Sequence, residues 1–200
     1  MSQHFVERGG LPPGLTSFTK IRLGWITKEQ VCFVKPGETA VAFLSPLSAG
    51  GGTLAVKIPI SQGKYYLVES RQPIGFDGAL PDSGMLVLKV DPDAPEGYGT
   101  VKIMDANPRS AHFRQATFRL DEGERNSFVD GKIAIIPLWR DGDKLGVLVT
   151  TSEKRAEALE AAHAVVMLMK RGGPQDRAAV QAKDAFMAFD FKRCIGLAGR

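Results

Sequence analysis

The chain has 200 residues, of which 44% are apolar and 24% are charged, and its formal net charge is +4. These fractions are close to the average of folded globular proteins, and they exclude a disordered, collagen-like or coiled-coil chain. The charges are scattered and form no long basic run, so we expect no nucleic-acid partner. No apolar stretch reaches the roughly 18 residues of a transmembrane helix, so we also expect no membrane span.

The composition changes sharply near residue 151. Before this point the chain is rich in glycine, proline and alternating apolar patterns, whereas after it the chain is rich in alanine with helical spacing. We therefore predict a β-rich domain over residues 1–151 and a helical hairpin over residues 152–200. The expected fold class is α+β: mainly antiparallel β, sandwich-like or two-layer, with a short N-terminal helix and the C-terminal hairpin.

The first predicted element is a short helix over residues 15–23, with Gly24 as its C-terminal stop. Apolar residues then alternate with a period of two over residues 54–60, which predicts a strand. Pro59 in that strand favours an edge position or a strand end, because proline has no N–H to donate to a neighbouring strand. Further strands are expected over residues 64–71 and 85–91.

A β-hairpin is predicted over residues 132–151, because two apolar β-type runs flank Asp141 and Gly142. Short connections between successive strands favour antiparallel pairing. Since long helices do not alternate with these strands, a doubly wound α/β fold is excluded.

The tail contains two sets of apolar residues spaced by 3, 4 and 3 positions, each of which lines one helix face. We expect the two helices to pack on each other and on the β part, and a partner-binding hairpin is the alternative. Thr150 and Glu153 predict a capping box at the start, or Ser152 is the N-cap residue. Gly172 and Gly173 end the first helix, and Pro174 can begin the second. The two sets are Leu159, Ala162, Val166 and Met169, and Ala179, Ala182, Phe186 and Phe189.

Familiar catalytic motifs are missing from these 200 residues, which contain no Gly-x-Ser-x-Gly, Walker A, Cys-x-x-Cys or His-Glu-x-x-His sequence. The three histidines, His4, His112 and His163, are far apart in the sequence. Ser17 and Lys20 match a Ser-x-x-Lys nucleophile pattern, but its partner motifs are absent, so we interpret the match as chance.

Two weaker features complete the inventory. Asp91, Asp93 and Glu96 offer oxygen ligands that calcium prefers, and a strand-to-loop turn explains them equally well. Cys32 and Cys194 are the only cysteines, and the sequence leaves open whether they pair.

Several stretches taken together resemble the region that follows the zinc motif in secreted metalloproteases of the immune inhibitor A type. They are Met1-Ser2-Gln3-His4, the segment Leu-Thr-Ser-Phe-Thr-Lys-Ile-Arg-Leu-Gly-Trp-Ile over 15–26, Tyr-Tyr-Leu-Val-Glu-Ser-Arg-Gln over 65–72, Gly-Phe-Asp over 75–77, Leu-Pro-Asp-Ser-Gly over 80–84, and Met-Leu-Val-Leu-Lys-Val-Asp over 85–91. The resemblance covers residues 1–150 approximately and leaves the helical tail outside.

The resemblance implies roles for particular residues. Met1 is similar to the Met-turn residue that forms the floor of the zinc site, and Lys20 and Trp25 are expected to anchor the following helix. Glu69 and Arg71 alternate with their neighbours, so they point to the same side of a strand and can form a structural ion pair. Asp77 is expected to form a turn. In the family a histidine often stands where this chain has Lys89.

The function implied is zinc-dependent hydrolysis of protein or peptide substrates by a full-length enzyme. The zinc helix would lie upstream of Met1, so this chain is expected to bind no cofactor itself and to be inactive alone. A fragment or late start is the favoured explanation, and a degenerate relative or a separate upstream chain are the others. The longer precursor would be secreted, and a chain complete as given would be cytoplasmic. The alternative function is a non-catalytic β-rich binding or interaction module.

Overall fold

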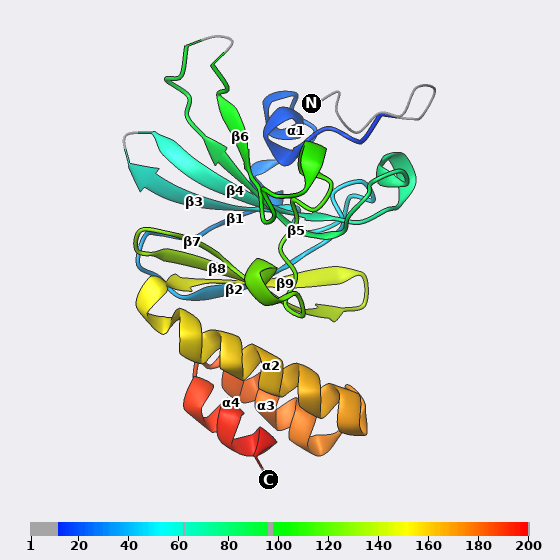
Figure 1. Ribbon diagram of the computed structural model, residues 1–200, viewed down its shortest axis with the longest axis vertical. Coiled ribbons are helices and arrows are strands. Elements are labelled where there is room, and N and C mark those ends of the chain that lie inside the picture. Colours follow the sequence, from blue (N-terminus) through cyan, green and yellow to red (C-terminus); the bar gives the residue numbers. More distant parts are fainter. Residues whose placement is uncertain (1–11, 62, 96–97, 200) are drawn as a thin grey trace.

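Nine strands form two sheets that face each other in the computed structural model, which describes residues 12–61, 63–95 and 98–199 (Figure 1). The five-stranded sheet has the order β1-β3-β4-β5-β6, and the four-stranded sheet has the order β2-β9-β8-β7. Every pairing is antiparallel except that of β1 with β3. This confirms the predicted mainly antiparallel, sandwich-like architecture. The strands are β1 (Val31–Phe33), β2 (Ala40–Leu44), β3 (Ala55–Ser61), β4 (Lys64–Arg71), β5 (Gly84–Val90), β6 (Val101–Met104), β7 (Phe128–Asp130), β8 (Ile133–Asp141) and β9 (Lys144–Thr151).

The main core lies between the two sheets, and alternation along β4 decides which side chains enter it. Tyr66 and Val68 belong to this inter-sheet core, whereas Leu67 belongs to a second cluster on the opposite face of the five-stranded sheet. Since side chains alternate along a strand, Glu69 and Arg71 share the outer face with Leu67.

Helix α1 (Ser17–Arg22) covers that outer face, and Phe18 and Ile21 pack against its apolar cluster (Figure 1). The chain leaves the helix through Leu23, and Gly24 has a φ of +73°. Glycine adopts this left-handed conformation without steric cost, which confirms the predicted stop.

Pro59 lies in β3 beyond the segment that pairs with β1, which ends at Lys57. The missing N–H of the proline therefore costs no hydrogen bond to β1, as expected for a strand end. The predicted hairpin is also present, formed by β8 and β9 around Asp141 and Lys144.

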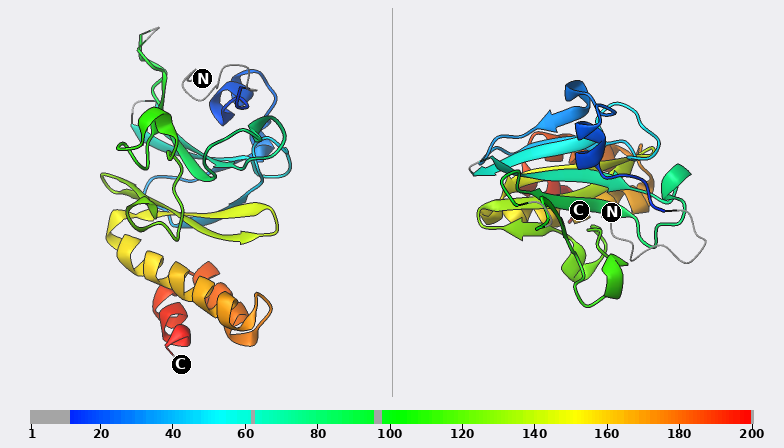
Figure 2. Two further views of the ribbon diagram at one scale, coloured as in Figure 1. Left: turned by 45° about the vertical axis from the view of Figure 1, so that its right-hand side comes forward. Right: turned by 90° about the horizontal axis from the view of Figure 1, so that it is seen from above.

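Three helices cover the outer face of the four-stranded sheet: α2 (Arg155–Gly172), α3 (Arg177–Met187) and α4 (Phe191–Ala198) (Figure 2). They share one apolar core with β8 and β9, in which the rings of Trp139 and Phe186 meet edge to face with centroids 5.1 Å apart. The C-terminal helices are therefore confirmed, but a hairpin of two was incomplete because α4 forms a third. Shorter 3-10 turns are η2 (Lys28–Gln30), η3 (Gly75–Asp77), η4 (Ala111–Phe113), η5 (Gly123–Arg125) and η6 (Ser152–Lys154).

The predicted helix starts in the tail were wrong in detail. Thr151 precedes the turn η6, and α2 begins only at Arg155, so neither the Thr150–Glu153 box nor Ser152 caps it. The second helix begins after Asp176, whose carboxylate accepts a hydrogen bond from the backbone N–H of Ala178, rather than at Pro174. An acidic N-cap residue satisfies the otherwise unpaired N–H groups of the first turn, which proline does not do. Along the described ranges, no helix combines the length and apolarity needed to cross a membrane.

Candidate functional site

A buried network of charges lies beneath α1, on the outer face of β4. Arg71 is its centre: Nη1 lies 3.3 Å from Oε1 of Glu69, and Nη2 lies 2.9 Å from Oδ1 of Asp77 on η3. Only 0%, 5% and 1% of Glu69, Arg71 and Asp77 are exposed. Charges this deeply buried require ionic and hydrogen-bonding partners, and each of the three has both.

Backbone groups of the segment before α1 complete the network. The N–H of Ser17 donates to Oε2 of Glu69 at 2.7 Å, and the N–H of Gly14 donates to Oδ1 of Asp77 at 2.8 Å. The guanidinium of Arg71 donates back to the carbonyls of Gly14 at 3.0 Å and Leu15 at 3.3 Å. These bonds fix the path of residues 14–17 against the sheet.

Lys20 brings a second cation to the same place. Its ammonium donates to the carbonyl of Leu47 at 2.7 Å. Burial lowers the pKa of Lys20, and the charges of Asp77, Arg71 and Glu69 also act on it, which places it within reach of all three. We call Lys20, Glu69, Arg71 and Asp77 the α1 cluster. It holds two positive and two negative groups, so its formal charge is balanced.

Four residues that the sequence singled out therefore meet in one cluster, including the Glu69–Arg71 pair expected from strand alternation. The ion pair is confirmed, and Asp77 adds a carboxylate where only a turn was expected. Trp25 lies apart from the cluster with 64% of its surface exposed. Met1 lies outside the described residues, so its Met-turn role stays a prediction.

The Ser-x-x-Lys match has no nucleophile geometry. Ser17 is fully buried, and its hydroxyl has no hydrogen-bond partner among the described residues. A nucleophile must be reached by substrate and activated by a neighbouring base. The structure gives Ser17 neither, in line with the interpretation as chance.

The side chains in the described part of the chain do not fit a metal ion, since no three His, Cys, Asp or Glu residues converge there. Asp91 instead pairs with Lys64 at 2.7 Å and accepts the N–H of Asp93 at 3.3 Å, and Glu96 lies outside the described residues. Calcium binding thus stays a prediction, and no zinc ligand is assigned.

The remaining histidines and cysteines have separate surroundings. Nε2 of His163 lies 2.8 Å from the carbonyl oxygen of Leu120, His112 lies on η4, and His4 is outside the described ranges. Cys32 and Cys194 are both free thiols and do not pair. Burial raises the pKa of Cys194 to about 11, so this thiol is a packing group rather than a nucleophile.

A second polar cluster joins the two sheets. The hydroxyl of Tyr66 on β4 donates to the carboxylate of Asp130 on β7, and Nζ of Lys89 on β5 lies 3.2 Å from the same carboxylate. These hydrogen bonds lower the pKa of Asp130, whereas burial, followed by Asp130 itself, raises the pKa of Tyr66. The sequence named Lys89 only as a departure from the family, because its cross-sheet partner is not visible in a local pattern.

A third cluster was missed by the sequence reasoning. The guanidinium of Arg125 binds the carboxylate of Asp82 and donates to the carbonyl of Thr117 at 2.8 Å, and the Thr117 hydroxyl donates to Asp82 at 2.7 Å. It fastens the segment after β6 to the start of β5. Asp82 was noticed as a turn residue, but no spacing rule links it to an arginine this far along the chain.

Comparison with known proteins identifies no relative, because no family model, curated protein or solved structure matches the chain. The function is therefore argued from the geometry and from the motif resemblance alone.

Proposed function

We propose that this chain is the downstream half of the catalytic region of a zinc metalloprotease of the immune inhibitor A type. In this role it supplies the scaffold beside the zinc site, and the zinc ligands and general base come from a segment upstream of Met1. The observation that carries the proposal is the α1 cluster, because Lys20, Glu69, Arg71 and Asp77 all belong to the motifs on which the resemblance depends.

The position of the cluster gives it a physical purpose in such an enzyme. The resemblance puts the floor of the zinc site just before α1, and the cluster holds the backbone of Gly14, Leu15 and Ser17 against β4. Catalytic geometry tolerates little displacement, so the segment that follows the site floor needs a rigid attachment. A network of charge-assisted hydrogen bonds provides one.

Exposed apolar side chains next to the cluster also support the proposal. The chain just after α1 exposes 53% of Leu23 and 64% of Trp25, and η3 exposes 77% of Phe76. Large apolar groups on rigid elements are suited to contact with another part of a protein. The zinc-binding half is the partner that the resemblance implies, with secretion of the longer protein.

The alternative, a non-catalytic β-rich binding module, rests on a different feature, the basic cleft described in the next subsection. The two functions make different predictions about metal and proteolysis, so one experiment separates them.

The experiment compares the 200-residue chain with the protein encoded when the reading frame is extended upstream of Met1. Zinc is measured by elemental analysis and proteolysis with casein. We expect neither zinc nor hydrolysis from the 200-residue chain, and one zinc with hydrolysis from an extended protein that contains His-Glu-x-x-His. An in-frame stop codon directly upstream, or stoichiometric zinc and activity in the 200-residue chain, would overturn the proposal.

A variant pair tests the role of the cluster within the extended protein. Arg71→Met should lower activity together with thermal stability, because the segment before α1 loses its attachment. Lys35→Met is the matched control, since Lys35 is exposed and contacts only Glu38, at 3.8 Å. Full activity in an Arg71→Met protein of reduced stability would show that the cluster does not position the site.

A further inference from the structure

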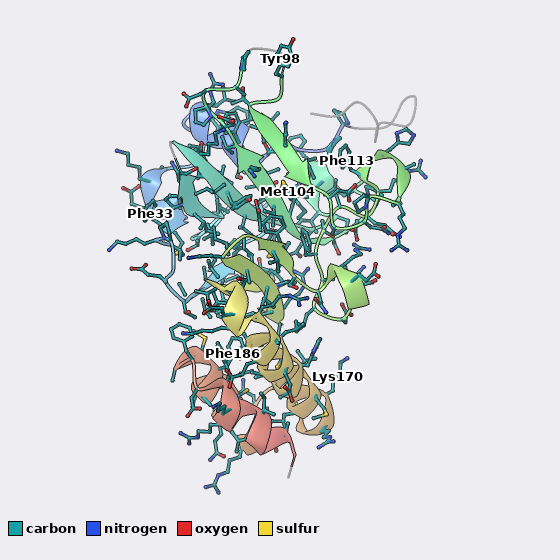
Figure 3. The ribbon with its side chains drawn as sticks, turned by 60° about the vertical axis from the view of Figure 1, so that its left-hand side comes forward. Phe33, Tyr98, Met104, Phe113, Lys170 and Phe186 are labelled. Carbon is teal, nitrogen blue, oxygen red and sulfur yellow. The ribbon has the colours of Figure 1, made fainter. Side chains whose placement is uncertain are left out.

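A cleft of about 830 Å³ lies between the C-terminal half of α2, the β8–β9 hairpin and residues 118–121. We call it the basic cleft. Its volume is within the range of sites that bind small organic molecules. It lies on the opposite side of the sandwich from α1, and Figure 3 shows Lys170 on α2, on the side of the molecule where η5 lies.

Positive charge dominates the lining. Arg119, Arg140, Lys170 and Arg171 all line the cleft, and Asp121 is the one carboxylate among the described lining residues. The cations come from three separate segments of the chain, so the fold rather than a local run brings them together.

Little in the protein neutralises these cations. The guanidinium of Arg119 lies 3.6 Å from Asp82 and 3.4 Å from Glu122, and that of Arg140 donates only to the carbonyl of Asp143, at 3.4 Å. Burial lowers the pKa of Arg140, and the positive charge of Arg119 lowers it further. An anion placed beside Arg140 would offset both effects.

Lys170 and Arg171 have no ion pair or hydrogen bond within the ranges that the structure describes. They lie in the last turn of α2, where cations stabilise the negative end of the helix dipole. That role accounts for these two residues but not for Arg119 and Arg140, which lie outside the helix.

The rest of the lining is mostly apolar. Leu138 and Trp139 come from β8, and Met167 and Met169 come from α2. The Trp139 ring is held by Phe186, and the hydrogen bond from His163 to the Leu120 carbonyl ties α2 to the opposite wall. One wall is therefore fixed, whereas the methionines are flexible enough to adapt to an occupant.

We propose that the basic cleft binds a single-chain organic anion of the fatty-acid class, with its carboxylate paired to Arg140 and its alkyl chain on the apolar lining. Arginine pairs well with carboxylates because its planar fork donates two parallel hydrogen bonds. This proposal does not depend on the peptidase role.

An extended peptide suits the cleft less well. Its backbone N–H and C=O groups would need hydrogen-bonding partners once removed from water. The strand that lines the cleft, β8, is already paired on both sides, and the Leu120 carbonyl is occupied by His163. An alkyl chain has no such requirement.

The test uses the full chain with Trp25→Phe, which leaves Trp139 as its single tryptophan. Dodecanoate, below its micelle concentration, is titrated while Trp139 fluorescence is recorded, and calorimetry gives the stoichiometry. We expect saturable binding of one anion per chain with a change in Trp139 emission. Dodecanol should bind about tenfold more weakly, because it has the chain without the charge.

Two variants and a control locate the site. Arg140→Met should weaken dodecanoate binding about tenfold, and Met167→Glu should weaken it independently by placing a negative charge on the apolar wall. Lys35→Met, a change of the same type at an exposed position, should leave binding unchanged. Equal binding to all variants, unsaturable binding, or binding of an acidic peptide in place of dodecanoate would overturn the proposal.

Discussion

At the scale of single residues, the α1 cluster shows how a strand can carry charges on a buried face. Desolvation of Glu69, Arg71 and Asp77 is costly, and their mutual attraction offsets that cost only while the whole set is intact. Arg71 is the member that contacts both carboxylates and two backbone carbonyls. Its removal should therefore do more damage than the loss of any one bond suggests.

We accordingly expect Arg71→Ala to lower the free energy of unfolding by about 3–5 kcal/mol, because two buried carboxylates lose their cation. Urea unfolding followed by far-UV circular dichroism measures this. The control is Arg109→Ala, which removes an ion pair to Glu124 whose two side chains are 85% and 87% exposed. That pair should contribute less than about 1 kcal/mol. Similar losses for both variants would mean that the cluster carries no special stability.

Asp130 gives a prediction about pH. The hydroxyl of Tyr66 and the ammonium of Lys89 hold the pKa of this carboxyl below its usual value. A depressed folded-state pKa contributes stability that is present above the unfolded pKa, about 3.9, and is lost as the pH falls through the folded value. The stability difference between wild type and Asp130→Asn should thus be constant from neutral pH down to about 5 and shrink below about 4.

Urea unfolding of both proteins at a series of pH values between about 7 and 2.5 measures that difference. Lys89→Met is the matched variant, since it removes one of the two donors and should move the loss to higher pH. A gap between wild type and Asp130→Asn that is as large at the lowest pH as at neutral pH would contradict the assignment.

At the scale of elements, local patterns predicted some parts of the fold well and others not at all. The strands β3, β4, β5, β8 and β9 carry a period of two or continuous apolar runs, and turn residues bound them, so sequence alone located them. The short strands β2, β6 and β7 carry no such signal. They form because the sheet edges beside them need hydrogen-bonding partners, which is a property of the assembled sandwich.

The third helix was missed for a related reason. Helix α4 has eight residues, too few to show a helical period clearly, and such short helices depend on packing for their stability. Its first residue, Phe191, is 4% exposed and packs on Phe186 of α3 with ring centroids 5.2 Å apart. The same limit explains the candidate site: the Glu69–Arg71 pair follows from alternation, but its partners Gly14 and Asp77 come from elsewhere in the chain.

Phe191→Ala should therefore cost about 3–5 kcal/mol of unfolding free energy, as expected for a large side chain removed from a core. Phe76→Ala is the control, because 77% of the Phe76 surface is already exposed and little burial is lost. Chemical denaturation of the two variants compares them directly. An equally small loss at both positions would show that α4 frays from the bundle in solution.

At the scale of the whole molecule, the structure stacks α1, two sheets and three helices in successive layers (Figure 1). The outer face of the four-stranded sheet is covered by the helices alone, and Ile136, Leu138 and Leu148 share their core. Without residues 152–200 these apolar side chains would face water. The predicted division into domains at residue 151 thus separates segments that bury one another.

We expect residues 1–151, made alone, to lack a cooperative unfolding transition, because exposing that apolar face removes a large part of the driving force for folding. The full chain should unfold in one step, with Trp139 fluorescence of the Trp25→Phe protein and far-UV circular dichroism giving coincident curves. Two separate transitions, or a cooperative transition in residues 1–151 alone, would instead support two independent domains. In that case the basic cleft, which both segments line, would be an interface between domains, and ligand binding there would depend on how they dock.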